Sequence, residues 1–437
     1  MSVKERDMYY AQRLARMIQC KTVSFKESFE PAEFLKLREV IAELFPLVIK
    51  KAELTIFGED AYLYKLKGKD ETRNVMIMSH HDVVAAKGDW QQDPFDGTIA
   101  DGKIWGRGTV DTKTPLFAEF SALEELLQEG SEFPVNVYLF SSHNEEIGGD
   151  GAVLAHEYFK ENHIQFDWIS DEGGAVIDPP MAGIDKKCAM MAVHEKGRCT
   201  VKLIANKTEG HASLSGGYQT PVMRMVSFMK EIDEKKPFIR KLHPEVRGMF
   251  EAMAPYMANP LKTIFSNLNI FSAVLIKMIP KLNATAAEML GTGCTFRKIT
   301  TEEDGSCIGE AFLRCINDED LSRDLESMRK IAAGYDVNIV VAENEYYRPS
   351  SLDSKGYRFV KGTVEKIFPY VAAVPFILPA GTDARRFTDL SDAVIRFAPI
   401  DIDGQQYTSV HNENENFSVD KLHLAVDFYK SLLKNYR

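Results

Sequence analysis

Acidic and histidine residues stand directly after several short apolar runs of this chain. The set comprises His80 and Asp82 after VMIM, Asp111 after IWGRGTV, Glu145 and Glu146 in HNEE after VYLFSS, Asp171 and Glu172 after FDWIS, and His411 in the later stretch TSVHNENE. Imidazole and carboxylate groups without thiolates suit Zn²⁺ or a similar divalent ion. The set has more carboxylates than one zinc ion needs. A site with two ions that share one carboxylate would account for this number, and such sites are used for hydrolysis.

The apolar runs themselves read as strands of a parallel sheet. Helical patterns at 4–20, 31–45 and 116–130 are interleaved with the strand-like runs VMIMSH, VNVYLFSS and FDWISDE, which is typical of an α/β layer fold. In a parallel sheet all strand carboxyl ends open on one edge, where ligands bind. We therefore expect side chains as distant in sequence as His80 and His411 to converge there.

Each of these features has an ordinary explanation when it is taken alone. A histidine beside a strand is more often a core or surface residue than a ligand. Paired glutamates such as Glu145 and Glu146 usually mark a solvated turn, and DEGG by itself also reads as a turn. Several separate explanations of this kind would be needed together, so the ordered set at strand ends favours a metal site.

The middle of the chain has a different pattern. The strand-like GRCTVKLIAN precedes a helical stretch at about 219–234, and the strands GCTFRKITT, GEAFLRCIN and VNIVVAE accompany a helix at 320–333. This order indicates a small α+β unit over 192–350, with a helical excursion at about 236–290. We expect it to be inserted into a larger domain that consists of residues 1–191 and 351–437.

Composition restricts the partners and the compartment. A length of 437 residues favours two domains, and a formal net charge of −11 argues against nucleic acid or an anionic membrane as the main partner. The N-terminal stretch lacks an apolar core of signal-peptide type. The apolar stretch 270–280 is too short to span a bilayer and is expected to form a buried or interface helix. Six scattered cysteines without a CxxC fit a reducing compartment, which predicts a cytoplasmic protein.

Eight motifs, in this order, resemble those of the M20 family of di-zinc peptidases and amidohydrolases: SHHDVV, WQQDPFDG, GKIWGRGTVDTK, NEEIGG, DEGG, EGHAS, GTDARRF and VHNENE. The resemblance runs from about residue 75 to the C-terminus. It is greatest to the branch that holds Gly-X carboxypeptidase, aminoacylase-1 and the N-acyl-amino-acid hydrolases. It implies a zinc-peptidase-like catalytic domain with a mixed, mainly parallel sheet flanked by helices, plus an inserted α+β lid and dimerisation domain.

The resemblance also implies a role for each matching residue. Two Zn²⁺ ions per subunit, with Co²⁺ or Mn²⁺ as substitutes, would be bound by His80, Asp111, Glu146, Glu172 and His411. Asp111 would bridge the ions and precede a cis peptide bond. Asp82 would hold the imidazole ring of His80 in its ligating tautomer, and Glu145 would be the general base.

Two neighbouring residues are left out of the metal site. Glu172 matches the family's ligand better than Asp171, because that carboxylate usually stands just before Pro or Gly. Side chains alternate along a strand, so His80 and Asp82 share a face while His81 points away.

Three further residues are expected to meet the substrate. His211 in EGHAS would reach the active site of the partner subunit and stabilise the oxyanion, which implies a homodimer through the lid; without the resemblance it would read as an exposed loop histidine. Arg385 in GTDAR is a candidate for binding the substrate carboxylate, and Arg314 is the candidate for a lid arginine. The lid segment around 305–317 is about four residues shorter than in the family and lacks its Asn and Pro, which leaves the substrate open.

These features together predict a metal-dependent amide hydrolase for a small substrate with a free carboxylate. The substrate would be a dipeptide, a peptide C-terminus or an N-acyl amino acid, and the water activated by metal would lose its proton to Glu145. Alternatives are a biosynthetic deacylase of acetylornithine or succinyl-diaminopimelate type, and a non-catalytic homologue that uses the fold for binding. The intact set of candidate ligands argues against the non-catalytic homologue, and the absence of a Cys-rich shell argues against a structural zinc protein.

Overall fold

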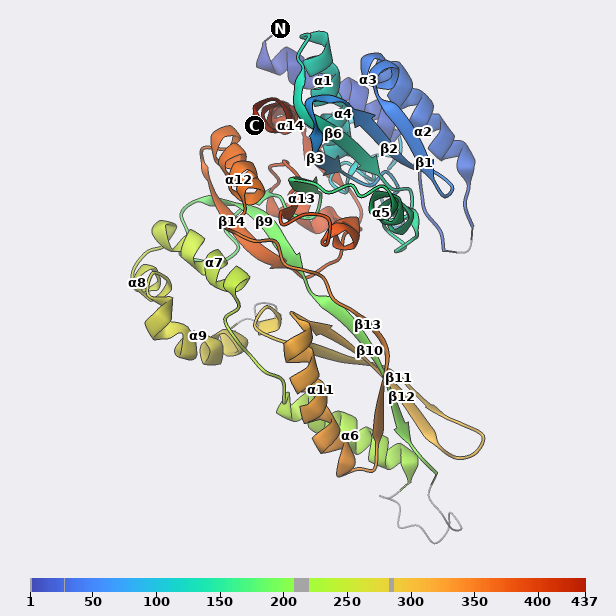
Figure 1. The fold of residues 1–437 in the computed structure, drawn as a ribbon, viewed down its shortest axis with the longest axis vertical. Helices are drawn as coiled ribbons and strands as arrows, with labels where there is room; N and C mark the ends of the chain where they lie inside the picture. The colour runs from blue at the N-terminus through green and yellow to red at the C-terminus, as the bar shows by residue number, and fades with distance from the viewer. Residues whose placement is uncertain (1, 27, 208–219, 283–286) are drawn as a thin grey trace. The chain divides into compact units, whose positions relative to one another are not determined.

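The computed structural model describes residues 2–26, 28–207, 220–282 and 287–437 (Figure 1). The described chain divides into two compact units, each of which is built from separate stretches of sequence. The first unit consists of Met1–His194, Gly248–Ser266 and Arg348–Arg437, and the second of Glu195–Arg247 and Asn267–Tyr347. Residues 248–266, which the sequence pattern assigned to the insertion, thus group with the first unit. The assignment of 192–350 to a lid and dimerisation domain stays a prediction.

A nine-stranded mixed sheet forms the centre of the first unit, in the order β1-β2-β6-β3-β7-β15-β9-β14 with β8 paired to β9. Its strands are β1 Glu53–Phe57, β2 Ala61–Leu66, β3 Gly68–Met78, β6 Phe133–Ser141, β7 Trp168–Asp171, β8 Val176–Ile177, β9 Lys187–Glu195, β14 Val371–Leu378 and β15 Val394–Arg396. The neighbours β6, β3, β7 and β15 run parallel, whereas β1, β2 and β9 pair antiparallel. The α/β class with a mixed sheet is therefore confirmed, and the parallel part is its centre.

Helices cover both faces of this sheet, which explains why its central strands are continuously apolar. Val75 and Ile77 of β3 pack into one hydrophobic cluster, and the alternate residues Met76 and Met78 pack into another. The first cluster includes side chains of α1 (Val3–Ile18), α2 (Pro31–Leu44), α3 (Pro46–Lys51), α4 (Lys113–Gln128), α12 (Lys355–Ile367) and α14 (Leu422–Asn435). The second includes α5 (Gly151–Glu161) and the 3-10 helix η3 (Asp383–Phe387).

A small three-stranded sheet joins two loops that are distant in sequence. It has the order β16-β5-β4, with β4 Ile99–Ala100, β5 Lys103–Trp105 and β16 Asn416–Ser418. The antiparallel pairing of Trp105 with Asn416 brings the stretch before α4 beside the stretch that follows the short helix α13 (Gly404–Ser409). Asp111 and His411 lie on these two stretches.

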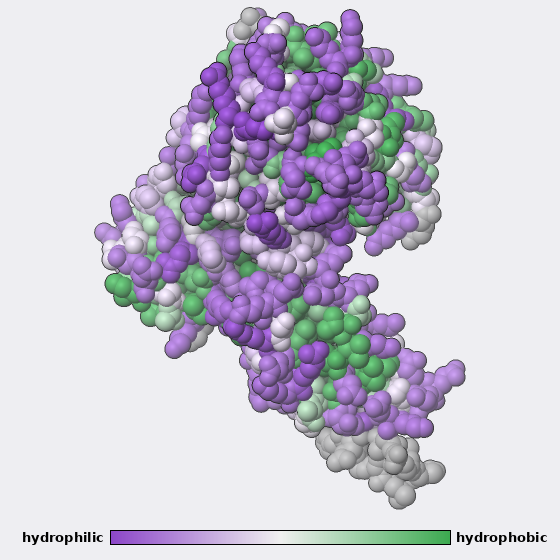
Figure 2. Space-filling view, viewed as in Figure 1, coloured by the Kyte–Doolittle hydropathy of each residue, from purple (hydrophilic) through white to green (hydrophobic). Residues whose placement is uncertain are grey.

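The second unit contains a four-stranded antiparallel sheet in the order β11-β12-β10-β13. Its strands are β10 Gly197–Ala205, β11 Gly293–Thr301, β12 Cys307–Cys315 and β13 Asn338–Glu345. Side chains of α6 (Pro221–Lys235) and α11 (Asp318–Ala333) share one hydrophobic cluster with this sheet. Ile299, Val340 and Val341 of the edge strands are exposed, and Figure 2 shows hydrophobic surface over this sheet.

Helices also occupy the stretch that was expected to be a helical excursion. They are α7 Pro244–Met253, the 3-10 helix η2 Ala254–Tyr256, α8 Leu261–Phe265 and α9 Leu268–Leu282. Helix α9 contains the apolar stretch 270–280, and its residues Ile270, Val274 and Met278 are 74%, 51% and 48% exposed. These three side chains are therefore not buried within the chain. No helix of the described residues is long and apolar enough to cross a membrane.

Candidate active site

Neighbouring parallel strands deliver the candidate residues to one edge of the large sheet. Strand β3 ends two residues before His80, β6 ends four residues before Glu145, and β7 ends at Asp171, next to Glu172. Because β6, β3 and β7 are adjacent and parallel, their carboxyl ends lie together. The edge predicted from the strand pattern is thus the place where these side chains meet.

A carboxylate between two imidazoles forms the centre of the site. Ligand atoms of His80, Asp111 and Glu146 all lie within 4.8 Å of one another. Oδ1 of Asp111 is 3.0 Å from Nε2 of His80, and Oδ2 is 3.1 Å from Nε2 of His411. The same nitrogen of His411 is 3.0 Å from Oε2 of Glu146. Each oxygen of Asp111 therefore faces a different histidine, which is the arrangement that a bridging carboxylate needs.

Burial and mutual hydrogen bonds dominate the electrostatics of these groups. Hydrogen bonds to Asp111 and Glu146 raise the pKa of His411 to about 10. Burial raises the pKa of Asp111, but hydrogen bonds from His411 and His80 outweigh it and hold that pKa below its usual value. Burial is also the main cause of the raised pKa of Glu146. Positive charge beside Asp111 and Glu146 therefore stabilises the ionised form of both carboxylates.

The donor set fits a divalent ion of the zinc type. Oε1 of Glu146 is buried and has no hydrogen-bond partner within the described part of the chain, so it is available as a ligand. Two imidazole nitrogens and several carboxylate oxygens, with no thiolate, match the ligand preferences of Zn²⁺ and of related ions.

Asp171 and Glu172 differ in how their carboxylates are used. Oδ1 of Asp171 accepts from the backbone N–H of Glu172 at 2.8 Å, and Oδ2 accepts from the backbone N–H of Ala384 at 3.0 Å. Burial raises the pKa of Glu172 well above its usual value, and the charges of Asp171 and Asp111 raise it further. Glu172 thus lies within electrostatic reach of the cluster, while Asp171 is occupied with the backbone.

Asp82 connects the His80 strand end to the glutamate loop. Its side chain is fully buried, with Oδ1 at 3.3 Å from Nδ1 of His80. The same Nδ1 lies 2.9 Å from the backbone carbonyl of Asp82. The carboxylate accepts from the backbone N–H groups of Glu145 and Glu146 at 3.2 and 3.1 Å, and from Oγ of Ser24 at 2.6 Å. One side chain therefore orients an imidazole and anchors both glutamates.

Glu145 is a buried carboxylate beside an arginine. Burial raises its pKa well above the usual value, and the nearby charge of His80 lowers it. Nη1 of Arg385 lies 3.8 Å from Oε1 of Glu145 and donates to the carbonyl of Thr382 at 2.8 Å. Arg385 is therefore part of the same site, next to the proposed base.

The other candidates lie elsewhere or outside the described residues. Arg314 is on β12 of the second unit, and His211 belongs to the part of the chain that is not described.

His81 makes contacts of its own outside the metal cluster. Its ring stacks on that of Tyr62 with 4.6 Å between the ring centroids, and its Nδ1 is 2.8 Å from Oγ of Ser141. The peptide bond between Asp111 and Thr112 is cis, as the resemblance implied.

Sequence reasoning missed several side chains that hold this site together. They are Ser24, Arg107, Asp383 and Glu415. Asp383 accepts a hydrogen bond from Ser142, next to the glutamate loop. Three of the four stand in the motifs GRG, GTDARRF and VHNENE, in each of which at most one residue was assigned a role. Ser24 has no such signal.

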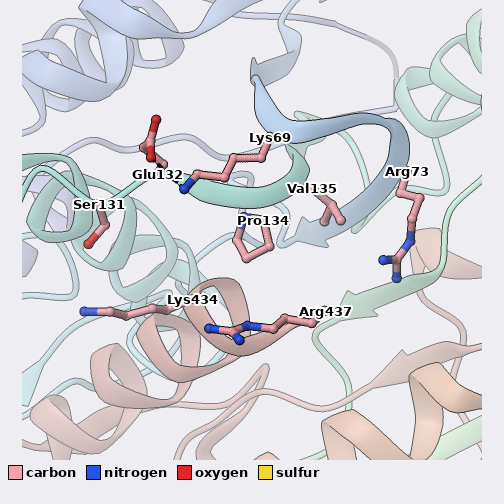
Figure 3. A pocket seen from close by; sticks show the side chains of 8 residues that line it. All are labelled: Lys69, Arg73, Ser131, Glu132, Pro134, Val135, Lys434 and Arg437. Carbon is pink, nitrogen blue, oxygen red and sulfur yellow. Dashed lines mark ion pairs between the residues drawn. The ribbon is translucent and has the colours of Figure 1, made fainter.

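A hollow of about 570 Å³ lies in another part of the first unit (Figure 3). Its lining residues are Lys69, Arg73, Ser131, Glu132, Pro134, Val135, Lys434 and Arg437. Three of its cations already face carboxylates: Lys69 is 2.8 Å from Glu132, Arg73 is 2.7 Å from Asp167, and Lys434 is 3.4 Å from Glu129. The hollow contains none of the candidate catalytic residues, and we assign no ligand to it.

Comparison with known proteins agrees with this geometry. The model of peptidase family M20/M25/M40 matches residues 76–435, and the chain therefore belongs to that family and is an enzyme. It is 30% identical over 450 residues to the probable carboxypeptidase S-like 2 of Dictyostelium discoideum, covering 98% of this chain and 85% of that protein. It is 27% identical over 449 residues to the human N-fatty-acyl-amino acid synthase/hydrolase PM20D1, covering 99% and 88%.

Solved structures show the same fold. The M20 family metallo-carboxypeptidase Sso-CP2 of Sulfolobus solfataricus superposes with a TM-score of 0.66 at 19% identity, covering 98% of each chain. The YXEP protein of Bacillus subtilis, described as a dinuclear metal binding peptidase of the M20 family, superposes with a TM-score of 0.59 at 12% identity, again covering 98% of each chain.

Proposed function

We propose that this chain is a di-metal hydrolase that cleaves an amide bond in a small substrate with a free carboxylate. The observation that supports this most directly is the carboxylate of Asp111, which faces His80 with one oxygen and His411 with the other. Family membership places the chain among hydrolases, and this carboxylate supports the finer assignment to a two-ion site.

His80, Asp111, Glu146, Glu172 and His411 would hold the two ions, which we propose to be Zn²⁺, with Co²⁺ or Mn²⁺ as substitutes. Asp111 is the proposed bridge, and the unpartnered Oε1 of Glu146 supports its role as a ligand. When bound, the ions would supply an acidified water and a polarised amide carbonyl.

Glu145 is the proposed general base. It would take a proton from the attacking water and deliver that proton to the departing amine, which requires a carboxylate that changes its protonation state easily. Burial, which raises the pKa of Glu145, supports this role. Asp82 would hold the His80 ring and the Glu145 backbone in register.

Three residues are proposed to meet the substrate. Arg385, 3.8 Å from Glu145, would bind the substrate carboxylate close to the base. His211 of the partner subunit would stabilise the oxyanion, and Arg314 would contact the substrate. We propose a homodimer through residues 192–350. The exposed apolar residues of the edge strands β11 and β13 support this proposal.

The relatives support N-acyl amino acids and peptide C-termini as substrate classes. Their names describe carboxypeptidases and N-fatty-acyl-amino acid hydrolases, and they align over most of this chain. The biosynthetic deacylase remains the alternative. The proposed location is the cytoplasm, which six cysteines without a disulfide support.

Metal analysis paired with a hydrolysis screen tests the proposal. The screen should contain dipeptides, N-acyl amino acids of increasing chain length, N-acetylornithine and N-succinyl-diaminopimelate, each with and without a chelator. We expect two zinc ions per chain and chelator-sensitive cleavage of an N-acyl amino acid or a dipeptide. Activity that survives removal of all metal would overturn the mechanism, and activity confined to the two biosynthetic substrates would favour the alternative.

A further inference from the structure

A fully buried glutamate gathers the loop that carries Asp111. Oε1 of Glu415 accepts from the backbone N–H groups of Val110 at 2.7 Å and of Asp111 at 3.0 Å. Oε2 accepts from the backbone N–H of Gly108 at 3.0 Å and from Nη1 of Arg107 at 2.6 Å. One carboxylate therefore fixes four donors within five consecutive residues, and the last of them belongs to the proposed bridging ligand.

The same connection runs in the opposite direction. Nη2 of Arg107 donates to the backbone carbonyl of Asn412, directly after His411, at 2.9 Å. The backbone N–H of Gly106 donates to the carbonyl of Glu415 at 2.9 Å. Arg107 is only 2% exposed, and its guanidinium lies over the ring of Trp90 at 5.2 Å. The loops at 106–111 and 411–415 thus hold each other through both side chains.

His411 needs such a connection more than the other candidate ligands do. Its side chain is 52% exposed, and it does not follow a strand of the large sheet, unlike His80. Its position opposite Asp111 therefore depends on the loop that carries it. Burial of the Arg107–Glu415 pair has a desolvation cost that apolar side chains would avoid. We therefore attribute the presence of this pair to the loop geometry that it fixes, and not to a gain in the stability of the fold.

We propose that Glu415 and Arg107 are positioning residues that hold Asp111 and His411 at the separation a shared metal site requires. The inference rests on the proposed two-ion site, but it is independent of which amide the enzyme cleaves. Neither residue needs to touch metal or substrate, since Glu415 acts through the backbone of Asp111 and of the residues before it, and Arg107 acts through the backbone of Asn412, next to His411. Residues that support ligands in this way commonly affect metal affinity by about 10- to 100-fold.

The test is metal affinity in the full chain, measured by competition with a chromophoric chelator, together with the visible absorption of the Co²⁺-loaded protein. Glu415→Gln keeps the shape but replaces one acceptor oxygen with an amide that cannot accept from the loop. Arg107→Lys keeps the charge but loses the fork that reaches Asn412. Asp401→Asn is the matched control, because Asp401 is also a buried carboxylate of the first unit, and its partners Tyr370 at 2.8 Å and Lys421 at 3.1 Å are not candidate site residues.

We expect Glu415→Gln and Arg107→Lys to weaken binding of at least one ion by about 10- to 100-fold and to shift the Co²⁺ spectrum. Asp401→Asn should lower the melting temperature and leave both readouts unchanged. Wild-type affinity in a folded Glu415→Gln protein, or an equal loss of affinity in Asp401→Asn, would overturn the inference. If Glu415→Gln does not fold, Arg107→Lys decides by the same criteria. A wild-type chain that binds no metal would instead refute the proposed function, and the inference with it.

Discussion

Removal of the Ser24 hydroxyl tests whether the N-terminal segment is part of the active site. Ser24 precedes the stretch matched by the family model, yet its Oγ donates to Oδ2 of Asp82 at 2.6 Å. The segment is aligned for this contact because Val83 donates its N–H to the carbonyl of Thr22 at 2.9 Å. Ser24→Ala therefore deletes one of the donors that hold the carboxylate behind His80.

The size of the effect follows from the type of bond. A hydrogen bond to a charged group contributes about 1.5–3 kcal/mol, and about 1.4 kcal/mol corresponds to a factor of ten. Asp82 keeps the backbone N–H groups of Glu145 and Glu146 as donors, so we expect the lower end of this range. Ser24→Ala should weaken zinc binding or lower kcat by about tenfold, with a loss of about 1.5 kcal/mol in the free energy of unfolding.

Two variants control for general effects of the substitution. Ser24→Thr keeps the hydroxyl and should retain near wild-type metal affinity. Ser306→Ala removes a serine–aspartate bond of the same length, 2.6 Å to Asp304, in the second unit, and should leave zinc binding and kcat unchanged. The assays are chelator competition, steady-state hydrolysis and urea unfolding. Equal metal affinity and kcat in Ser24→Ala and in the wild type would refute the reasoning.

Three further outcomes are expected. Glu145→Gln should retain both metal ions while kcat/KM falls by about 10²–10⁴-fold; equal loss of metal would contradict its role as base. His211→Ala should also lose turnover and keep metal, and mixing it with Glu145→Gln should restore activity in heterodimers if the site is shared between subunits. Burial lowers the pKa of His143 in the folded chain from 6.5 to about 4. Between these two pH values the unfolded chain binds a proton on His143 that the folded chain does not bind, so acidification destabilises the fold. His143→Phe should remove about 3 kcal/mol of this loss near pH 4, measured by urea unfolding; an unchanged pH dependence would contradict it.

Much of the site could be predicted because its residues follow strands. Apolar runs such as Val75–Met78 identify buried strands, and parallel pairing brings their carboxyl ends together. The strand pattern is therefore sufficient to locate His80, Glu145 and Glu172 on one edge. The same pattern also included Asp111 and His411, but these two residues do not end strands of the large sheet. The pairing of β16 with β5 in the small sheet brings their stretches together instead.

Local patterns alone could not predict the extent of parallel pairing. The central strands β6, β3 and β7 are parallel as expected, and β15 also joins them in parallel, but β1, β2 and β9 join antiparallel. The direction of an added strand depends on the path of the chain between strands, which apolar periodicity does not record. Similarly, residues 248–266 group with the first unit although their sequence continues the helical pattern of the middle region.

The sequence by itself determined which chemistry this protein has available: imidazoles and carboxylates at strand ends, in the order of a metallohydrolase family. Only the tertiary structure decided how those groups are held, since Ser24 contacts Asp82 and Glu415 collects the loop before Asp111 across separations of 58 and about 300 residues. The physical reason is that strand and helix periodicity reports burial of neighbouring residues, whereas a hydrogen bond between distant loops exists only once the packed chain has closed the distance between them.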